Sequence, residues 1–409
     1  MLKNNTEKVW NINFFLLWQG QFVSGIGDFV YQIAIGFWVL SVTGSTALMA
    51  TLMASSLIPQ LIVFPFSGVV VDRVNRKWMI VSMDLIRGFA VLLIAIAAFM
   101  GILKIWMVFT VGIILGVCLA FFNPSVQSSL PDIVPRSKLV KANAAFSMIG
   151  ASSKIIGDSL GGFFFQILGV PLLFLTNSLS YLLSAVTGLF LVIPNVHHDA
   201  ERMPFFKEMR SGFVFTWENK GIRNLFISTF FTNFFRIIGI ILILPLFQMN
   251  KELGAALYGL SVGTAAAGAF AGFLFSSIIH IKPSHRFFIL CLMGSAYSIC
   301  RMIFPFFLKL YIILPLMFIS GVAISLALIL FDAGIQTAVP ADKRGKVFAL
   351  LNTLTSGVWP LGMILAGVLA EFISIPFLIS VSSALSLLCY VVLFFIRSAK
   401  NTINFEPTN

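Results

Sequence analysis

Long apolar runs recur along the whole chain, and no other feature limits its fold so strongly. Short polar or Gly/Pro-rich breaks separate twelve such runs, at 12–41, 47–71, 78–100, 105–128, 141–168, 172–194, 223–249, 256–280, 286–308, 311–338, 346–373 and 375–397. About 20 apolar residues suffice for a helix that crosses a bilayer. The runs lack the apolar–polar alternation of barrel strands. Because backbone in lipid must satisfy its own hydrogen bonds, the sequence predicts an all-α integral membrane protein with twelve transmembrane helices.

The composition leaves no room for a sizeable soluble catalytic domain. Of the 409 residues, 59% are hydrophobic and only 10% are charged, whereas soluble domains are about 25% charged. The four cysteines lie inside apolar runs, without the spacing of a metal site or a disulfide framework. No small-residue cleavage site follows the first apolar run, so we expect a retained helix there rather than a signal peptide.

The basic residues predict the orientation in the membrane. Of the 27 Lys and Arg residues, twenty fall in the termini and loops of one side and three in loops of the other. Cytoplasmic loops carry such an excess, so we expect both termini and the central loop in the cytoplasm. The net charge of +12 is therefore a topology signal and does not indicate nucleic-acid binding.

A single long polar loop divides the chain into two halves of six spans. We expect an N-terminal six-helix bundle at 1–196, a cytoplasmic linker loop at 197–221 and a C-terminal six-helix bundle at 222–409. The segment from Phe122 to Pro131 aligns without gaps to that from Phe331 to Pro340, with matching Phe, Gln and Pro residues. Parallel repeats of this kind allow two bundles to rock about a central site.

Charged residues inside the spans are costly, at about 2.5–3.5 kcal/mol or more each at the bilayer centre. Apart from Glu371 near the end of one span, there are eight: Asp28, Asp84, Asp158, Asp332, Arg87, Lys154, Arg236 and Arg301. The pairs Asp84–Arg87 and Lys154–Asp158 have spacings of three and four residues, which allow neutralisation on one helix face. We expect the other four to pair between helices or to face water.

Polar residues form stripes at helical spacing on four spans. They are Gln21, Ser24, Asp28, Tyr31 and Gln32 on the first; Ser147, Gly150, Lys154, Asp158 and Gly161 on the fifth; Thr229, Thr232, Asn233 and Arg236 on the seventh; and Asn352, Thr355, Ser356 and Trp359 on the eleventh. We interpret them as the lining of an aqueous cavity shared by the two halves. The alternative is that these residues only join helices to one another.

A carboxylate in such a cavity is a natural proton carrier, because a cationic substrate competes with the proton for it. Asp28 is the first candidate for this role and Asp332 is the second. Asp332 lies towards the end of its span, so it could instead cap the helix or pair with basic loop residues.

The loop after the second span carries a recognisable motif. Its functional positions are Gly68, Asp72, Arg73, Arg76 and Lys77. It resembles the Gly-x-x-x-Asp-Arg-x-x-Arg-Lys signature of the major facilitator superfamily. The resemblance implies that Gly68 permits close helix approach and that ion pairing around Asp72 closes the cytoplasmic side. Asn75 stands where the family often has Gly, and Asn readily adopts a left-handed turn.

Further segments narrow the resemblance to the bacterial branch that contains macrolide efflux proteins and the enterobactin exporter. They are Gly27-Asp28, Thr43-Gly44-Ser45, Asp84-Leu85-Ile86-Arg87, Asn123-Pro124-Ser125, Ala142-Asn143-Ala144 and Gly334-Ile335-Gln336-Thr337-Ala338. The similarity implies export from the cytoplasm by proton antiport. We expect an exporter of amphipathic small molecules in the bacterial inner membrane, and a monomer. Membrane lipids are its surroundings, and no cofactor is expected. The branch is functionally mixed, so a siderophore or another native metabolite, or a lipid, remains an alternative substrate.

The chain departs from the drug antiporters of the superfamily at two places. Their helix-5 motif Gly-x-x-x-Gly-Pro-x-x-Gly-Gly is matched here by Ser153, Gly157, Asp158, Gly161 and Gly162, so an Asp replaces the Pro. Many of them also have an arginine on the fourth span, and residues 105–128 contain none. Lys154 or Arg236 is the expected substitute in proton coupling.

Other function classes find less support. No His-Glu-x-x-His helix, metal pair or nucleophile with a positioned base indicates a membrane enzyme, and no phosphate-binding loop indicates direct ATP drive. A receptor that transports nothing stays open, and it predicts little effect from neutralising Asp28.

Overall fold

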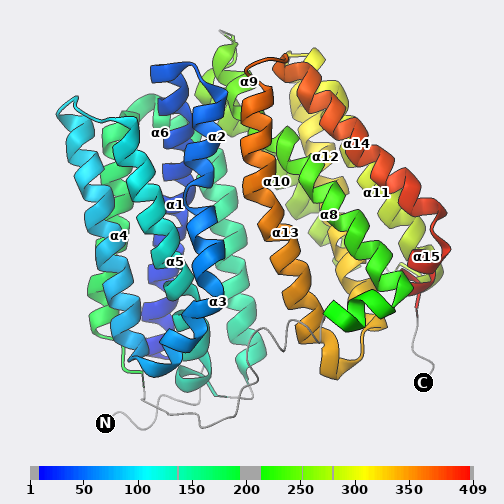
Figure 1. The fold of residues 1–409 in the computed structure, drawn as a ribbon, viewed down its shortest axis with the longest axis horizontal. Coiled ribbons are helices and arrows are strands. Elements are labelled where there is room, and N and C mark those ends of the chain that lie inside the picture. The colour runs from blue at the N-terminus through cyan, green and yellow to red at the C-terminus, as the bar shows by residue number, and fades with distance from the viewer. Residues whose placement is uncertain (1–8, 136–137, 194–212, 251, 279–280, 406–409) are drawn as a thin grey trace. The chain divides into compact units, whose positions relative to one another are not determined.

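The computed structural model describes residues 9–135, 138–193, 213–250, 252–278 and 281–405, and in these ranges it is helical with no strand (Figure 1). The first half contains α1 (Ile12–Thr43), α2 (Thr46–Ala54), α3 (Leu57–Arg73), α4 (Arg76–Phe99), α5 (Ile105–Ile133) and α6 (Leu139–Leu189). The second half contains α8 (Lys220–Ile241), α9 (Ile243–Met249), α10 (Gly254–Ile278), α11 (Pro283–Ile303), the 3-10 turn η2 (Phe304–Phe306), α12 (Leu310–Ala338), α13 (Ala341–Leu369), α14 (Ile375–Phe395) and α15 (Arg397–Ile403).

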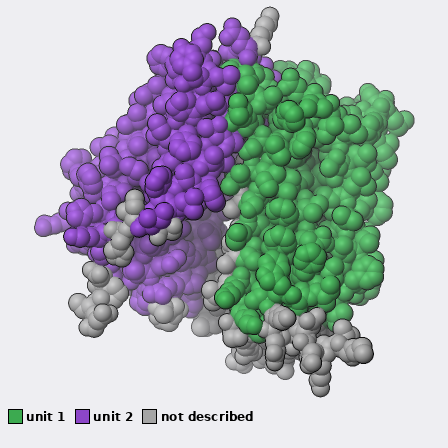
Figure 2. Space-filling model, turned by 180° about the vertical axis from the view of Figure 1, so that it is seen from behind, with its two compact units in different colours: residues 1–44, 51–200, 253–260 green, residues 45–50, 201–252, 261–409 purple. Residues whose placement is uncertain are grey.

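The chain forms two compact units (Figure 2). Unit 1 comprises residues 1–44, 51–200 and 253–260, and unit 2 comprises 45–50, 201–252 and 261–409. Both α2 and α10 therefore contribute residues to each unit. Most of the predicted linker 197–221 lies outside the described residues.

Eleven helices in the described ranges are long and apolar enough to cross a membrane, compared with the twelve expected. The difference lies in α6, where the predicted spans 141–168 and 172–194 meet. Gly169 has a left-handed φ of 67° and breaks the helix just before Pro171, and the span counted there is Ser159–Leu189. Glycine adopts this conformation without steric cost.

Two other predicted spans are interrupted. The run 47–71 breaks at Ser55 and Ser56, which separate α2 from α3, and the run 223–249 breaks at Leu242 between α8 and α9. The hydroxyl of Ser55 donates a hydrogen bond to the carbonyl of Leu52 at 2.6 Å. Such a side-chain bond competes with the backbone hydrogen bonds of the helix, which favours a break here. Hydropathy alone does not reveal such a break.

Unit 1 is organised around the long contact between α1 and α6, while α4 packs on α6 and α5 packs on α3 and α4. Glycines allow the two central helices to approach closely. A Cβ atom on Gly157 of α6 would lie 2.4 Å from Cβ of Phe29 on α1, and one on Gly27 would lie 2.4 Å from Oδ1 of Asn177. Small residues at helix contacts serve the same purpose in other membrane proteins.

The ends of α1 are determined by local chemistry. Asn11 caps its N-terminus by accepting a hydrogen bond from the backbone N–H of Phe14 at 2.9 Å. Gly44 ends it in a left-handed conformation, with its N–H bonded to the carbonyl of Leu40 at 2.9 Å. The expected turn at Thr43-Gly44-Ser45 is thus a glycine C-cap.

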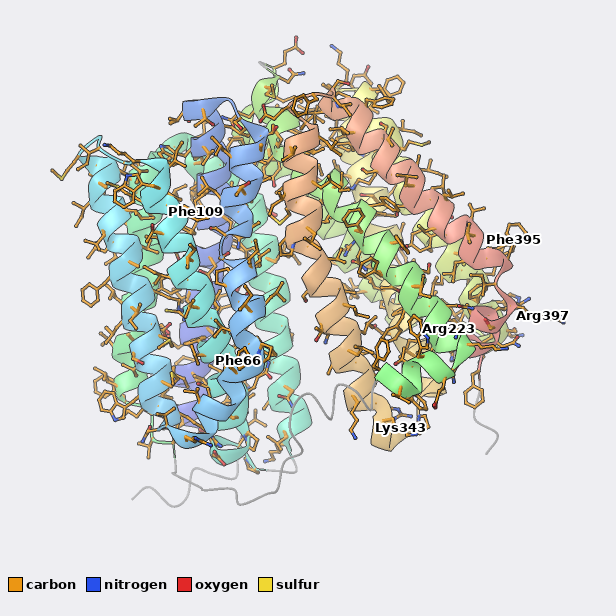
Figure 3. The ribbon with its side chains drawn as sticks, viewed as in Figure 1. Phe66, Phe109, Arg223, Lys343, Phe395 and Arg397 are labelled. Carbon is orange, nitrogen blue, oxygen red and sulfur yellow. The ribbon has the colours of Figure 1, made fainter. Side chains whose placement is uncertain are left out.

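In unit 2, α11 packs on α12 and α14, and α8 packs on α13 and α14. Large aromatic side chains point outward from both units, among them Phe66, Phe109 and Phe395, which are 60%, 38% and 78% exposed (Figure 3). They suit a lipid-facing surface. Arg223 and Lys343 lie in the half of unit 2 where α8 and α13 begin (Figure 3).

Candidate functional site

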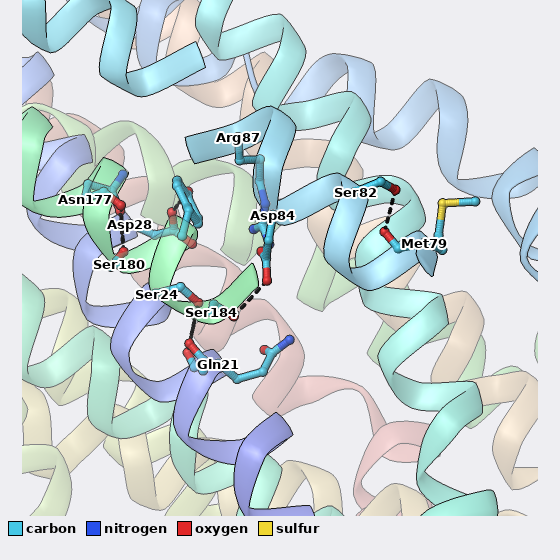
Figure 4. Close-up of polar contacts among 12 residues, drawn as sticks. Gln21, Ser24, Asp28, Met79, Ser82, Asp84, Arg87, Asn177, Ser180 and Ser184 are labelled. Carbon is cyan, nitrogen blue, oxygen red and sulfur yellow. Dashed lines mark hydrogen bonds and ion pairs between the residues drawn. The ribbon is translucent and has the colours of Figure 1, made fainter. Parts of the chain in front are cut away.

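Asp28, the first candidate proton carrier, is bound from the neighbouring helix. The phenol of Tyr181 on α6 donates a hydrogen bond to Oδ1 of Asp28 on α1. Tyr181 is buried, whereas Asp28 is only partly buried. The polar stripe of α1 therefore faces α6 at this level (Figure 4).

Next to this pair lies an ion pair within α4. Arg87 and Asp84 contact each other as their spacing predicts, and both are fully buried, at 1% and 0% exposure. Ser184 of α6 donates to Oδ2 of Asp84 at 2.7 Å. Figure 4 shows these groups between α4 and α6.

The guanidinium of Arg87 links the two carboxylates. It lies 4.5 Å from the ring centre of Tyr181 and 4.1 Å from that of Phe122 on α5. It is ion-paired with Asp84 and reaches Asp28 only through Tyr181, which bonds to that carboxylate. This polar cluster, Asp28, Asp84, Arg87, Tyr181 and Ser184, thus contains two carboxylates and one cation. Its cation lies on the third predicted span, whereas residues 105–128 of the fourth contain no arginine.

Several buried polar atoms of α1 and α6 have no hydrogen-bond partner in the described structure: Nε2 of Gln21, the hydroxyl of Tyr31 and Nδ2 of Asn177. Buried polar groups are nearly always bonded to protein or water. Unpaired groups of this kind are able to bind water or a polar group of a ligand. Gln32, on α1, is partly buried.

The predicted Lys154–Asp158 pair stays a prediction, because the side chain of Asp158 lies outside the described residues. Lys154 is exposed, and its Nζ lies 5.0 Å from the ring centre of Phe29.

Unit 2 contains a cavity of about 310 Å³. Its lining includes both polar stripes expected on the second half, together with apolar residues of four helices: Ser228, Thr229, Thr232, Asn233, Arg236, Leu290, Ile324, Ala327, Leu328, Phe331, Asp332, Leu351, Asn352, Thr355, Ser356, Trp359, Tyr390 and Leu393. One cavity of unit 2 therefore brings together Arg236, Asn233 and Asp332. Nine of its eighteen lining residues are polar or charged, and its volume is at the lower end of small-molecule sites.

Arg236 is positioned within its own helix. Its guanidinium donates to Oδ1 of Asn233, whose amide donates to the carbonyl of Thr229 at 2.9 Å. Asp332 is exposed, and within the described ranges neither residue forms an ion pair with another side chain.

The loop motif is only partly as expected. Arg76 forms an ion pair with Asp132 near the end of α5 and donates to the carbonyl of Ser128 at 2.9 Å. Arg73 is exposed, and Nζ of Lys77 lies 5.8 Å from the ring centre of Trp78. The side chain of Asp72 lies outside the described residues.

One expectation about this motif is wrong. Asn75 has φ −66°, so it is not left-handed; instead its side chain caps α4 by accepting from the N–H of Trp78 at 3.3 Å. No described atom lies within 4 Å of a Cβ placed on Gly68, and the close helix approach expected there stays a prediction. Capping satisfies an otherwise unpaired helix N–H group, which explains a polar residue at position 75.

Sequence reasoning missed Tyr181, Ser184 and Asp132. Tyr181 is 153 residues from its partner, and no pattern along the chain indicates that pairing. A signal existed for Asp132, since an acid next to a basic motif on the same side of the membrane is a natural partner.

These spans and the charged groups within them define a multi-pass membrane protein. The sequence profile described as "Transmembrane secretion effector" matches residues 9–409, and the chain belongs to this family of the major facilitator superfamily.

Relatives and solved structures agree with this assignment. Macrolide efflux protein A of Streptococcus pyogenes is 26% identical over 386 residues, covering 90% of this chain and 91% of that protein. The multidrug efflux pump Tap of Mycobacterium bovis is 23% identical, covering 87% of each. The chain thus lies in the macrolide efflux branch.

Two solved transporters show the same fold. A bacterial homologue of the iron transporter ferroportin aligns with a TM-score of 0.72 at 18% identity, covering 93% of this chain and 97% of that one. The nucleoside transporter NupG aligns with a TM-score of 0.67 at 15% identity, covering 94% and 99%.

Proposed function

We propose that this protein is a secondary exporter of amphipathic small molecules, such as macrolide-like drugs, and that it exchanges them for protons at Asp28. The observation that carries the proposal is the polar cluster of unit 1, with two carboxylates and a single guanidinium. The similarity to efflux proteins supports the direction of transport.

The charges of the cluster assign different roles to the two acids. Asp84 is buried against Arg87 and accepts from Ser184, so its charge is compensated in place. Asp28 is partly buried and has the Tyr181 hydroxyl as its donor. Asp28 is therefore the carboxylate that takes up and releases a proton, while Asp84 stays ionised and holds Arg87.

A cation close to Asp28 favours its charged form, so a cationic substrate bound there expels the proton. The reverse step follows when the substrate has left. Tyr181 and Arg87 stabilise the charged form between these steps. Gln21 and Tyr31, with their unpartnered atoms, would bind the polar groups of the substrate or its water.

The cavity of unit 2 is, by itself, suited to an amphipathic molecule. Trp359 and Phe331 offer apolar surface, while Arg236 and Asp332 offer one charge of each sign. The two six-helix bundles alternate access from either side, with the loop motif of Asp72 and Arg76 closing the cytoplasmic side. We place the protein in the bacterial inner membrane as a monomer with both termini in the cytoplasm.

Efflux from cells tests this proposal. Cells expressing the full chain are loaded with a labelled amphipathic panel that includes a macrolide, and export is followed with and without a protonophore. We expect at least one compound to leave in a protonophore-sensitive manner, and Asp28→Asn to abolish this export. The control is Glu252→Gln, the same chemical change at an exposed residue outside the spans.

Protonophore-insensitive export would contradict proton antiport. If no compound of the panel leaves, the substrate is instead a native metabolite, such as a siderophore, or a lipid.

A further inference from the structure

Arg301 of α11 has hydrogen-bonding groups that the protein leaves unused. Its Nε and Nη1 atoms are buried and have no hydrogen-bond partner in the described residues. The guanidinium lies 5.5 Å from the ring centre of Tyr297 and 6.0 Å from that of Phe304. Aromatic faces attract a cation, but they do not bond with its N–H groups in the plane of the guanidinium.

The side chain of Arg301 lines a small space within unit 2. This space has a volume of about 10 Å³, which suits a single water-sized species. Its lining consists of residues from α8, α11 and α14: Arg236, Gly239, Ile240, Tyr297, Ser298, Arg301, Ile379, Ser383 and Ser386. Two arginines and three serines thus surround a space too small for an organic molecule.

The charge around this space is uncompensated. Within the described ranges, neither Arg236 nor Arg301 has a carboxylate within 4 Å. Asp332 shares the larger cavity with Arg236 but does not line the small one. The buried arginine of unit 1 differs from these two, because Arg87 forms an ion pair with Asp84. Two unpaired cations inside the spans are costly without a counter-ion.

We propose that the space between Arg236 and Arg301 is a binding site for a small monovalent anion of the size of chloride. Such an anion neutralises part of the positive charge of Arg236 and Arg301, which a neutral water molecule cannot do. It accepts hydrogen bonds from the unused N–H groups of Arg301 and from serine hydroxyls.

The serines are arranged for this role. Ser298 bonds to the carbonyl of Gly294 at 3.0 Å and contacts the hydroxyl of Ser386 at 3.2 Å, and both serines are buried. Ser298 has a single hydroxyl proton, so it donates either to Gly294 or to Ser386; in the second case the proton of Ser386 is free to point at the anion. Arg236 lines both the small space and the larger cavity. An anion bound in the small space would therefore also fix the position of Arg236 in the wall of the larger cavity.

Chloride binding to the purified full-length protein tests the site. Sodium chloride is titrated against sodium gluconate at constant ionic strength, while the melting temperature and the line width of the chloride-35 magnetic resonance signal are recorded. We expect saturable broadening and a rise in melting temperature of about 5 °C once chloride exceeds its Kd by about 100-fold.

Arg301→Gln is expected to abolish both responses. The control Arg397→Gln removes an exposed arginine of the same unit and should leave them unchanged. If Arg301→Gln does not fold, Ser386→Ala decides, with an expected weakening of chloride binding of about 2- to 10-fold.

A wild-type protein that responds equally to chloride and gluconate would overturn the proposal, as expected of a cavity that holds only water. An unchanged response in Arg301→Gln, or in Ser386→Ala where that variant decides, would overturn it too. None of these results depends on the transported substrate or on proton coupling.

Discussion

Tyr181 donates its phenolic hydrogen bond to Asp28, and the ring of the same tyrosine lies 4.5 Å from the guanidinium of Arg87. One side chain thus contacts both the proposed proton carrier and the cation that stabilises its charged form. Through Arg87 the contact extends to Asp84 on α4. Three helices of unit 1 are joined at this point in the polar cluster.

Removing the hydroxyl of Tyr181 tests whether this hydrogen bond serves transport. We expect Tyr181→Phe to lower proton-coupled flux about 10-fold, since a hydrogen bond to a charged group is worth about 1.5–3 kcal/mol. The aromatic ring over Arg87 is retained, so the protein should still fold. Flux in reconstituted vesicles is compared with that of Tyr311→Phe, which alters a tyrosine that is 76% exposed. Equal flux in the two variants would argue against a role for the hydroxyl.

The buried ion pair predicts a particular pattern of stability. Asp84→Asn leaves the charge of Arg87 buried and uncompensated, and we expect a loss of about 3–5 kcal/mol in the free energy of unfolding. The double variant Asp84→Asn/Arg87→Met removes the cation as well and should recover much of this loss. Denaturant unfolding in mixed micelles measures both. A double variant as unstable as the single one would show that the charge is not the cause.

The pair between Arg76 and Asp132 is expected to act as a unit. Both Arg76→Gln and Asp132→Asn should slow transport, and the double variant should be no slower than either single one, because the residues share one contact. Transport rates of the four proteins form a double-mutant cycle. Independent, additive effects would mean that the contact does not contribute to transport.

Glu371, which lies just beyond the end of α13, predicts a dependence of stability on pH. The backbone N–H of Ala47 donates to its carboxylate at 2.9 Å, with a further bond from Ser45 at 2.7 Å. These bonds hold the pKa of Glu371 below its ordinary value. Because the folded pKa is the lower one, the stabilisation is complete above the unfolded value of about 4.3 and is lost as pH falls through the folded value.

We therefore expect Glu371→Gln to be less stable than the wild type at pH 7, by under about 1 kcal/mol because the carboxylate is exposed. The difference should vanish in acid, when the wild-type carboxyl is protonated. Melting temperatures from pH 7 downwards measure it, with Glu252→Gln as the control. A difference that persists unchanged in acid would exclude the ionised carboxylate as its source.

The sequence predicts the fold well where a helix only has to be apolar enough to lie in lipid. Uninterrupted apolar runs gave spans such as α4, α12 and α14 close to their observed bounds. The breaks within spans were harder to predict, because the helices are interrupted at Ser55 and Leu242 while the mean hydropathy of each run stays that of a membrane span. Gly169 followed by Pro171 was a readable signal, and it separates the two predicted spans.

Only those features of the candidate site that depend on a single helix could be predicted from the sequence. Asp28 stands out as a charge in an apolar helix, and the Asp84–Arg87 pair follows from helical spacing. The partner of Asp28 depends on how α1 and α6 pack, which no periodicity along one helix encodes. Similarly, Asn75 was expected in a left-handed turn because of what the family often has there, whereas its side chain prefers to cap α4.

The central claim is that Asp28 carries the proton that is exchanged for substrate, and proton movement in reconstituted vesicles tests it most directly. A gradient of a transported compound, identified by the efflux panel, is imposed in the absence of a pH gradient, and the internal pH is followed with a trapped dye. We predict that the wild type and Glu252→Gln move protons against the substrate flow, and that Asp28→Asn moves none while remaining folded. Proton movement at the wild-type rate in Asp28→Asn would contradict the account.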